Sequence, residues 1–183
     1  MRKELRIAGF GGQGVISMGI LVATAVGKYE DKPVAQTQSY GPEARGGACK
    51  TEVVVSDDEI DFIEAISPDT LITMSQPALD KYLADVNVDT CDVIVDNSLV
   101  DNVPDTVKNV YRVPATKLAE DEFGTAVVAN VIMFGAYVAI SKIVNVESCK
   151  ASLKDNMPPK FIDMNYKAFD VGYHYASKLG ENK

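Results

Sequence analysis

The sequence predicts an α/β fold. We expect a three-layer α/β/α single domain over residues 1–183, with a mostly parallel or mixed sheet. Three observations support this. The chain opens with an apolar strand, a glycine-rich turn and an apolar helix, as a Rossmann-like unit does. Predicted strands and helices then alternate, which favours parallel strands joined by crossovers. No repeat or long linker divides the 183 residues, so we expect one core.

The first unit spans residues 5–26. Residues 5–9 are mainly apolar and predict a strand, and the glycine-rich turn follows directly. The apolar run 15–26 predicts a helix, which we expect to end at Gly27. Because this run has almost no polar face, we expect the sheet, neighbouring helices or a partner chain to cover it.

The middle of the chain supplies the remaining strands and two short helices. Each predicted strand is a short segment in which apolar residues are continuous or alternate with polar ones. They are predicted at residues 33–38, 48–56, 70–74, 92–95 and 109–113, the first of them weakly. The short helices are predicted at residues 77–83 and 115–122.

Two longer helices complete the chain. Residues 126–141 follow a break at Gly124, and the final helix, residues 160–179, follows two prolines. The first is apolar except for Asn130, but it is shorter than the roughly 18–20 residues of a membrane span, so we interpret it as a buried helix. In the final helix, apolar residues recur at three- and four-residue spacing, which predicts core packing rather than a cofactor site. They are Ile162, Tyr166, Phe169, Tyr173 and Ala176.

Charge and cysteine content exclude several classes of protein. With 18 Lys+Arg against 26 Asp+Glu the formal net charge is -8, and the arginines are scattered, so we expect no nucleic-acid binding. Cys49, Cys91 and Cys149 lie far apart and only one histidine is present, so we expect neither a metal site nor an iron–sulfur cluster. Unpaired thiols and a start without a signal-peptide pattern predict a cytoplasmic protein with no membrane partner.

The glycine-rich turn is the first candidate site. The segment from Gly9 to Gly14 satisfies G-x-G-x-x-G between a strand and a helix, where backbone N–H groups can receive an anion. A dinucleotide site would also need an acidic residue at the end of the second strand, whereas Glu30 and Asp31 come before it. P-loop chemistry has no support either, because no Gly-Lys-Ser/Thr follows. Contact with a ligand or partner and simple tight packing are therefore equally supported. The candidate residues are Gly11, Gly12, Gln13 and Gly14.

A second glycine-rich loop, residues 40–47, is the other candidate site. It carries an aromatic ring, a carboxylate and an arginine in a segment bent by glycine and proline. The arginine offers a planar pair of donors suited to a carboxylate or phosphate, on a substrate or a neighbouring subunit. An ion pair within the loop is the alternative. In a parallel sheet, both loops would lie at one edge. The candidate residues are Tyr40, Glu43, Arg45, Gly46 and Gly47.

Groups able to carry out catalysis are scarce. His174 lies between two tyrosines near the end of the last helix, where a surface or packing role is expected. Cys49 falls within a strand, and no serine or cysteine stands in a nucleophile elbow. The acidic run 57–64 could bind a cation or a basic partner, but such a run is more often a solvated edge. We therefore expect no catalytic residue, and a chain that is part of a larger enzyme.

Four groups of residues recur together in one known family. They are Gly11-Gly12-Gln13-Gly14, the loop from Tyr40 to Gly47, Ala129-Asn130 with Gly135, and Asn165, Ala168 and Gly172 in the last helix. In this combination the chain resembles, over nearly its whole length, the gamma subunit of 2-oxoacid:ferredoxin oxidoreductases. Within that family, the second loop resembles the 2-oxoglutarate-type enzymes more than the pyruvate or indolepyruvate types.

The resemblance implies a multi-subunit enzyme that converts a 2-oxoacid, coenzyme A and oxidised ferredoxin into acyl-CoA, carbon dioxide and reduced ferredoxin, or runs in reverse. In the family, thiamine diphosphate lies between the alpha and beta subunits, and iron–sulfur clusters lie in beta or in a ferredoxin-like delta subunit. This chain alone is therefore expected to bind no cofactor, and its partners would be the alpha, beta and delta subunits and ferredoxin. The two glycine loops and Asn130 would shape access for coenzyme A or form the subunit junction. Two alternatives are a free-standing module that binds NAD or ATP at the first glycine turn, and a purely structural assembly subunit.

Overall fold

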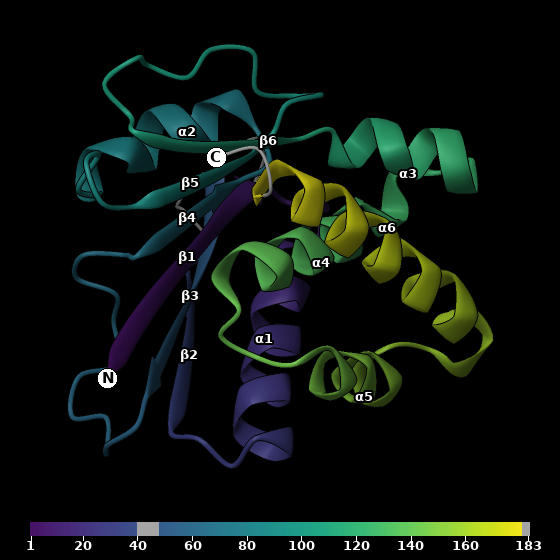
Figure 1. Ribbon diagram of the computed structural model, residues 1–183, viewed down its shortest axis with the longest axis horizontal. Helices are drawn as coiled ribbons and strands as arrows, with labels where there is room; N and C mark the ends of the chain where they lie inside the picture. Colours follow the sequence, from purple (N-terminus) through teal and green to yellow (C-terminus); the bar gives the residue numbers. More distant parts are fainter. Residues whose placement is uncertain (40–47, 181–183) are drawn as a thin grey trace.

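The computed structural model describes residues 1–39 and 48–180. It contains a six-stranded sheet with helices on both faces (Figure 1). The strands are β1 (Arg2–Phe10), β2 (Val34–Ser39), β3 (Ala48–Ser56), β4 (Thr70–Thr73), β5 (Asp92–Asp96) and β6 (Asn109–Val113). All of the predicted strands are present, with shifts of a few residues at their ends.

The strand order is β2-β3-β1-β4-β5-β6, with the first strand of the chain inside the sheet. Strands β1, β4, β5 and β6 are parallel neighbours, whereas β3 is antiparallel to both β1 and β2. Strand β2 therefore runs in the same direction as β1, and β3 alone is reversed. This arrangement confirms the expectation of a mostly parallel or mixed sheet.

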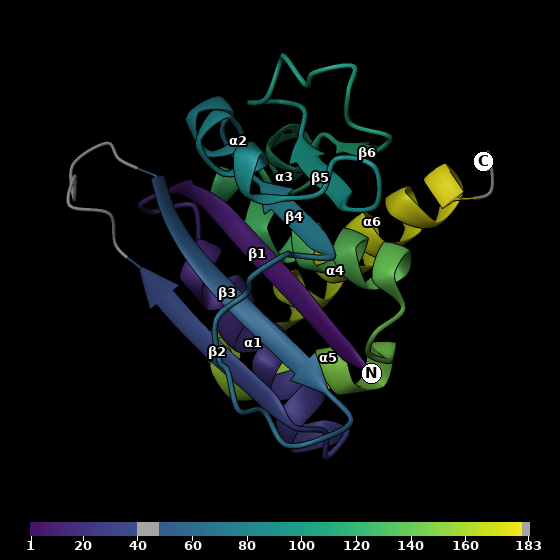
Figure 2. The ribbon, with the colours of Figure 1, turned by 90° about the vertical axis from the view of Figure 1, so that its left-hand side faces the viewer.

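Most helices cover one face of the sheet, and α2 (Gln76–Tyr82) covers part of the other (Figure 1). The helices of the larger layer are α1 (Val15–Tyr29), α3 (Ala115–Phe123), α4 (Ala129–Ser141), α5 (Val146–Asn156) and α6 (Ile162–Gly180). Three single turns of 3-10 helix are η1 (Leu83–Asp85), η2 (Ala126–Val128) and η3 (Pro159–Phe161). On the opposite face, the chain between β3 and β4 crosses in front of β1 and β3 (Figure 2).

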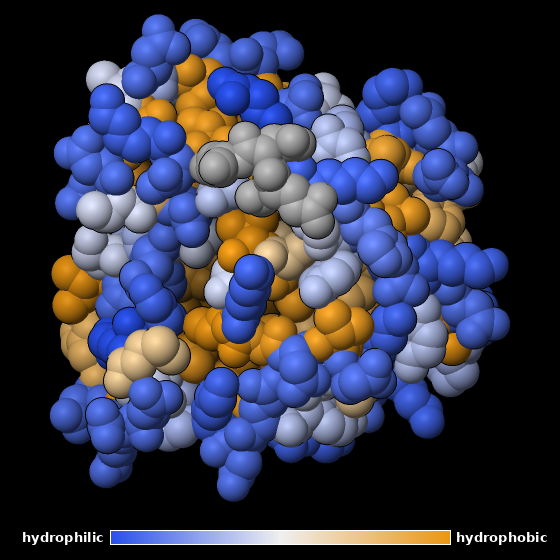
Figure 3. All heavy atoms as spheres, viewed as in Figure 1, coloured by the Kyte–Doolittle hydropathy of each residue, from blue (hydrophilic) through white to orange (hydrophobic). Residues whose placement is uncertain are grey.

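The main core lies between the sheet and the larger helical layer. Helix α4 is buried from Ala129 to Val138, which confirms that the apolar run is a core helix. It crosses α6 closely, and the rings of Phe134 and Phe169 meet edge to face with centroids 5.3 Å apart. In the view of Figure 3, hydrophobic residues show in the middle of the face and mostly hydrophilic ones surround them. No described helix is both long and apolar enough to cross a bilayer.

Two helix predictions need correction. Helix α1 does not end at Gly27 but continues to Tyr29. A Cβ atom on Gly27 would lie 2.6 Å from Cγ1 of Val34, so this glycine allows α1 to pack closely on β2 rather than ending the helix. Helix α5 was not predicted. It buries only one narrow stripe, although Asn145 caps it by accepting a hydrogen bond from the N–H of Ser148 at 2.9 Å.

Candidate functional site

The candidate site begins where β1 ends. The N–H of Gln13 donates to the carbonyl oxygen of Phe10 at 3.2 Å, which closes a tight turn. Gly12 (φ 93°) and Gly14 (φ 74°) adopt left-handed backbone that residues with a Cβ rarely take. Gly14 caps α1 without a side-chain hydrogen bond. The first N–H groups of α1, which have no partner inside the helix, therefore lie at the carboxyl end of β1.

The side chain of Gln13 ties the turn to the end of β1 and to the residue that follows β4. Its Oε1 accepts a hydrogen bond from the N–H of Phe10 at 2.7 Å, and its Nε2 donates to the carbonyl oxygen of Met74 at 2.7 Å. A Cβ on Gly9 would meet Oε1 of Gln13 at 2.5 Å, so the glycine leaves room for this amide. Since the amide already bonds within the fold, the turn offers a ligand mainly backbone N–H groups.

Asn130 reaches the same turn from the first turn of α4. Its Nδ2 donates to the carbonyl oxygen of Gly14 at 3.2 Å, and only 6% of the residue is exposed. A Cβ on Gly14 would overlap this carboxamide, so the glycine and the asparagine fit each other. The structure thus brings together all the predicted site residues that it describes, namely Gly11, Gly12, Gln13, Gly14 and Asn130.

A cavity of about 500 Å³ opens beside the turn. Gly12, Gly14 and Ser17 line one side of it, and apolar residues line the other. Val127 is 79% exposed at its rim, and Phe161 is 42% exposed. Sequence reasoning missed this apolar wall because the Met157-Pro158-Pro159 segment indicated only a helix break. The apolar lining is Val127, Val128, Met157, Pro158, Phe161 and Met164.

The electrostatics of this cavity favour an anion or a neutral group. The positive end of the α1 dipole lies at its wall, and no acidic residue occupies the first turn of α1. Its lining contains no charged side chain among the described residues. A ligand there would meet backbone N–H groups, hydroxyl and amide groups and an apolar wall, the mixture typical of small-molecule sites. An apolar segment of another protein could fill the same space.

The second loop lies outside the described residues, and with it Tyr40, Glu43, Arg45, Gly46 and Gly47. The residues that flank it are described. Ala48, at the start of β3, pairs with Phe10 at the end of β1, and Ser39, at the end of β2, pairs with Lys50. The strand ends that lead into the second loop therefore lie at the same edge of the sheet as the glycine turn.

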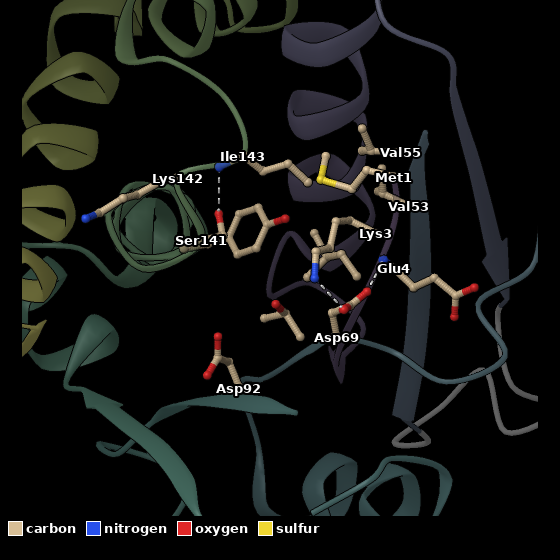
Figure 4. A pocket seen from close by; sticks show the side chains of 13 residues that line it. Met1, Lys3, Glu4, Val53, Val55, Asp69, Asp92, Ser141, Lys142 and Ile143 are labelled. Atoms are coloured by element: carbon tan, nitrogen blue, oxygen red, sulfur yellow. Dashed lines mark hydrogen bonds and ion pairs between the residues drawn. The ribbon is translucent and has the colours of Figure 1, made fainter. Parts of the chain in front are cut away.

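A second cavity lies at the opposite end of β1. It has a volume of about 200 Å³ and contains none of the predicted site residues. Lys3 and Asp69 point toward one another at its wall and form an ion pair of 2.7 Å (Figure 4). Burial raises the pKa of Tyr137, another lining residue, so its hydroxyl stays neutral. Because Lys3 and Asp69 already bind each other, they offer a ligand less than free charges would. We therefore consider this cavity a weaker candidate than the glycine-turn site.

The family model for pyruvate ferredoxin/flavodoxin oxidoreductase matches residues 4–175. The chain belongs to this family. It is 44% identical over 181 residues to the 2-oxoglutarate synthase subunit KorC of Methanocaldococcus jannaschii, covering 98% of this chain and 96% of that relative. It is also 44% identical over 178 residues to KorC of Methanothermobacter marburgensis, covering 94% and 95%. The crystal structure of a keto/oxoacid ferredoxin oxidoreductase gamma subunit from Geobacter sulfurreducens matches with a TM-score of 0.85 and 36% identity, covering 95% of this chain and 98% of that one. The predicted family and fold are confirmed.

The three cysteines of this oxidoreductase-family chain lie in environments that do not suit an iron–sulfur cluster. All three are buried, and burial raises the pKa of Cys91 and of Cys149 to about 12. Thiolate is the form that binds iron, so these environments disfavour a cluster. Among the described residues, no three His, Cys, Asp or Glu side chains are grouped to hold a metal ion.

Of the other titratable groups singled out in this oxidoreductase-family chain, only Cys49 lies near the glycine turn. His174 is exposed on α6, as a surface role requires. Cys49 is buried in β3, and its thiol donates weakly to the carbonyl oxygen of Gly9 at 3.4 Å. The acidic side chains of residues 57–64 are exposed. Within the described residues, nothing forms an evident acid–base or nucleophilic centre at the glycine turn.

Proposed function

We propose that this chain is the gamma subunit of a 2-oxoglutarate-type 2-oxoacid:ferredoxin oxidoreductase. The assembled enzyme would convert 2-oxoglutarate, coenzyme A and oxidised ferredoxin into succinyl-CoA, carbon dioxide and reduced ferredoxin, or catalyse the reverse. The observation that carries the proposal is the 44% identity to KorC along almost the full length of both chains. We also take residues 1–183 as one gamma-type domain of this family.

The role proposed for the chain is to shape the junction with the catalytic subunits. At one edge of its sheet, the chain would present backbone N–H groups, side-chain amides and apolar side chains to the neighbouring subunits. Thiamine diphosphate and iron–sulfur clusters would be held by the alpha, beta or delta subunits, in keeping with the buried, protonated cysteines of this chain. Exposed apolar side chains at the cavity rim, such as Val127, support a neighbour at this edge.

For coenzyme A, the proposed contacts are the N-terminus of α1 and Arg45. Free N–H groups beyond Gly14 suit a phosphate oxygen, and an arginine can donate two parallel hydrogen bonds to two oxygens of the same phosphate. The loop that carries Arg45 begins after the exposed Ser39 and ends before the buried Ala48. Ala48 pairs with Phe10, which belongs to the glycine turn. This proximity of the two loop entrances supports a shared role.

The first experiment tests the subunit assignment. The chain is co-expressed with candidate alpha, beta and delta subunits from the same organism, and the purified complex is assayed for ferredoxin reduction that depends on 2-oxoglutarate and coenzyme A. We expect activity only when this chain is present. A complex that assembles and turns over at the same rate without it would overturn the assignment.

The second experiment separates coenzyme A access from simple subunit contact. In the assembled enzyme, Arg45→Ala should raise the KM for coenzyme A about tenfold or more, the effect of losing a charge-assisted pair. Arg112→Ala, at an exposed position of β6, is the matched control. If the KM for coenzyme A is unchanged and the complex assembles normally, Arg45 does not bind coenzyme A. The loop would then serve only the contact between subunits.

The competing function is a free-standing nucleotide-binding module. A ligand that binds only the folded chain raises the melting temperature of the chain once the ligand concentration exceeds the Kd. We expect NAD and ATP at millimolar concentration to leave the melting temperature of the isolated chain unchanged. A clear rise with either nucleotide would favour the module instead.

A further inference from the structure

The connection between β3 and β4 presents large apolar side chains to solvent. Residues 57–67, called here the 57–67 loop, cross the face of the sheet opposite α1 (Figure 2). Phe62 is 48% exposed, Ile63 is 52% exposed and Ile66 is 70% exposed. Three such side chains within five residues form a local apolar surface, unlike the isolated apolar residues common on protein surfaces.

The loop is held in place by three side chains from alternate positions of β1. Arg2 donates from Nη1 to the carbonyl oxygen of Phe62 at 2.9 Å and from Nη2 to that of Glu64 at 3.0 Å. Glu4 accepts from the N–H groups of Ile66 and Ser67 through Oε2, both at 2.8 Å.

Arg6 completes the set by donating to the carbonyl oxygen of Ala65 at 3.2 Å. Glu4 and Arg6 are only 8% and 4% exposed, so these hydrogen bonds lie largely out of water. Because the anchors bind main-chain groups, they fix the backbone of the loop and leave its side chains free to make other contacts.

The anchored backbone turns the small residue inward and the large ones outward. Ala65 is 7% exposed, whereas the adjacent Ile66 is 70% exposed. A loop that served only to cover the sheet would gain stability by burying the isoleucine. The observed orientation therefore suits contact with something outside the chain, and the fixed backbone lowers the entropy lost on binding.

The charges around this surface indicate the kind of partner. The loop carries five carboxylates and no basic side chain. Asp57 pairs with the N-terminal amino group at 2.9 Å, but no ion pair involves the other four within residues 1–39 and 48–180. Those four, Asp58, Glu59, Asp61 and Glu64, are exposed next to the apolar side chains.

We propose that the 57–67 loop is a docking surface for another subunit of the oxidoreductase, whose contact site is an apolar cleft edged by lysine and arginine. The inference rests on the proposed function, since it takes the partner from the same complex. A second copy of this chain would bring two acidic loops together, and a membrane surface is itself anionic, so charge disfavours both occupants. A basic, apolar protein surface complements both features of the loop.

The test uses the co-expressed complex. A photo-crosslinking phenylalanine analogue replaces Ile66, and in a control complex it replaces Thr106, which is exposed between β5 and β6. We expect the analogue at position 66, and not at 106, to cross-link to one partner subunit, at a peptide that contains lysine or arginine. Since Ile66 is mostly exposed, the change should leave folding of the chain intact.

Two sets of variants test the two parts of the surface. Phe62→Ser combined with Ile66→Ser should weaken association with that subunit about tenfold or more. Asp58→Asn combined with Asp61→Asn should slow association about tenfold at low ionic strength, with the difference vanishing at high salt. Asp105→Asn, an exposed carboxylate elsewhere, is the charge control.

The outcomes separate this inference from the proposed function. If the complex assembles and is active but position 66 gives no cross-link, the docking surface is wrong and the subunit assignment stands. A cross-link to a second copy of this chain, or to an acidic peptide, overturns the docking proposal as well. If the chain does not assemble with the alpha and beta subunits at all, both proposals fail.

Discussion

The carboxamide of Asn130 donates to the carbonyl oxygen of Gly14, 3.2 Å away, and occupies the space where a side chain on Gly14 would begin. Two residues 116 positions apart thereby join the start of α4 to the start of α1. The contact joins two parts of the cavity lining, because Gly14 belongs to the glycine turn and Asn130 to α4.

Replacing Gly14 with alanine should destabilise the protein. The alanine would need a left-handed backbone at φ 74°, and its Cβ would overlap Asn130. We expect a loss of about 1–3 kcal/mol in the free energy of unfolding, measured with urea. Gly11→Ala is the matched control, because nothing lies within 4 Å of its Cβ position. Equal effects of the two substitutions would show that the contact between Gly14 and Asn130 is not the cause.

The crossing of α4 and α6 depends on two glycines. A Cβ on Gly172 would overlap the carbonyl group of Ile132, and one on Gly135 would overlap that of Phe169. Because backbone atoms cannot move aside as a flexible side chain can, Gly172→Ala should cost about 3 kcal/mol of stability. Lys167→Ala, exposed on the same helix, should change it by less than about 0.5 kcal/mol. A fully stable Gly172→Ala variant would contradict the close crossing.

The thiols of Cys91 and Cys149 should react slowly in the native protein. Burial raises the pKa of each from 9.0 to about 12, which lowers the thiolate fraction about 1000-fold at pH 8. Labelling with iodoacetamide, followed by mass spectrometry, should therefore be about 1000-fold slower than in urea. Fast labelling of either residue in native protein would mean that it is accessible, and would reopen a reactive role.

Acid should destabilise the protein partly through Glu52. Burial favours the neutral acid, but hydrogen bonds from Lys50 and Arg6, each 2.7 Å long, outweigh it and hold the pKa of Glu52 below its ordinary value. A pKa that is lower in the folded than in the unfolded chain adds stability above about pH 4.5, and this stability is lost as pH falls through the folded pKa.

The variant Glu52→Gln should accordingly lose stability at pH 7, by about 3 kcal/mol for a broken buried pair, and should depend less on pH below 5. Urea unfolding between pH 3 and pH 7 measures both effects. Asp121→Asn, in an exposed pair on α3, should behave as the parent protein does. If Glu52→Gln keeps the parent pH dependence, another carboxylate is responsible.

Much of the sheet could be predicted because its strands are short, apolar and separated by turn-forming residues. The direction of β3 was not predicted. Its residues are buried on both faces apart from Lys50, so its pattern carries no information on direction. A cue was present in the spacing, since residues 40–47 are too few for the helical crossover that a parallel pair needs.

The glycines of the turn and Asn130 could be singled out from the sequence, but the apolar wall of the cavity beside them could not. Glycines in a strand–turn–helix unit indicate a special backbone locally, and the structure confirms this at Gly12 and Gly14. The apolar wall combines residues of η2, of η3 and of the segments beside η3, which come from separate stretches of the sequence, and such a long-range arrangement leaves no local signature. Helix α5 escaped prediction for a related reason, since it buries few apolar side chains, with Leu153 among them.

The position of β1 inside the sheet has a consequence for how the polypeptide acquires its shape. Its nine residues pair with β3, up to 54 positions later, and with β4, which ends at Thr73. During synthesis β1 must therefore wait until residues 48–73 have been made before its two neighbouring strands exist. Such distant pairings slow folding, so β1 stays unpaired during this time and is a natural client for a chaperone.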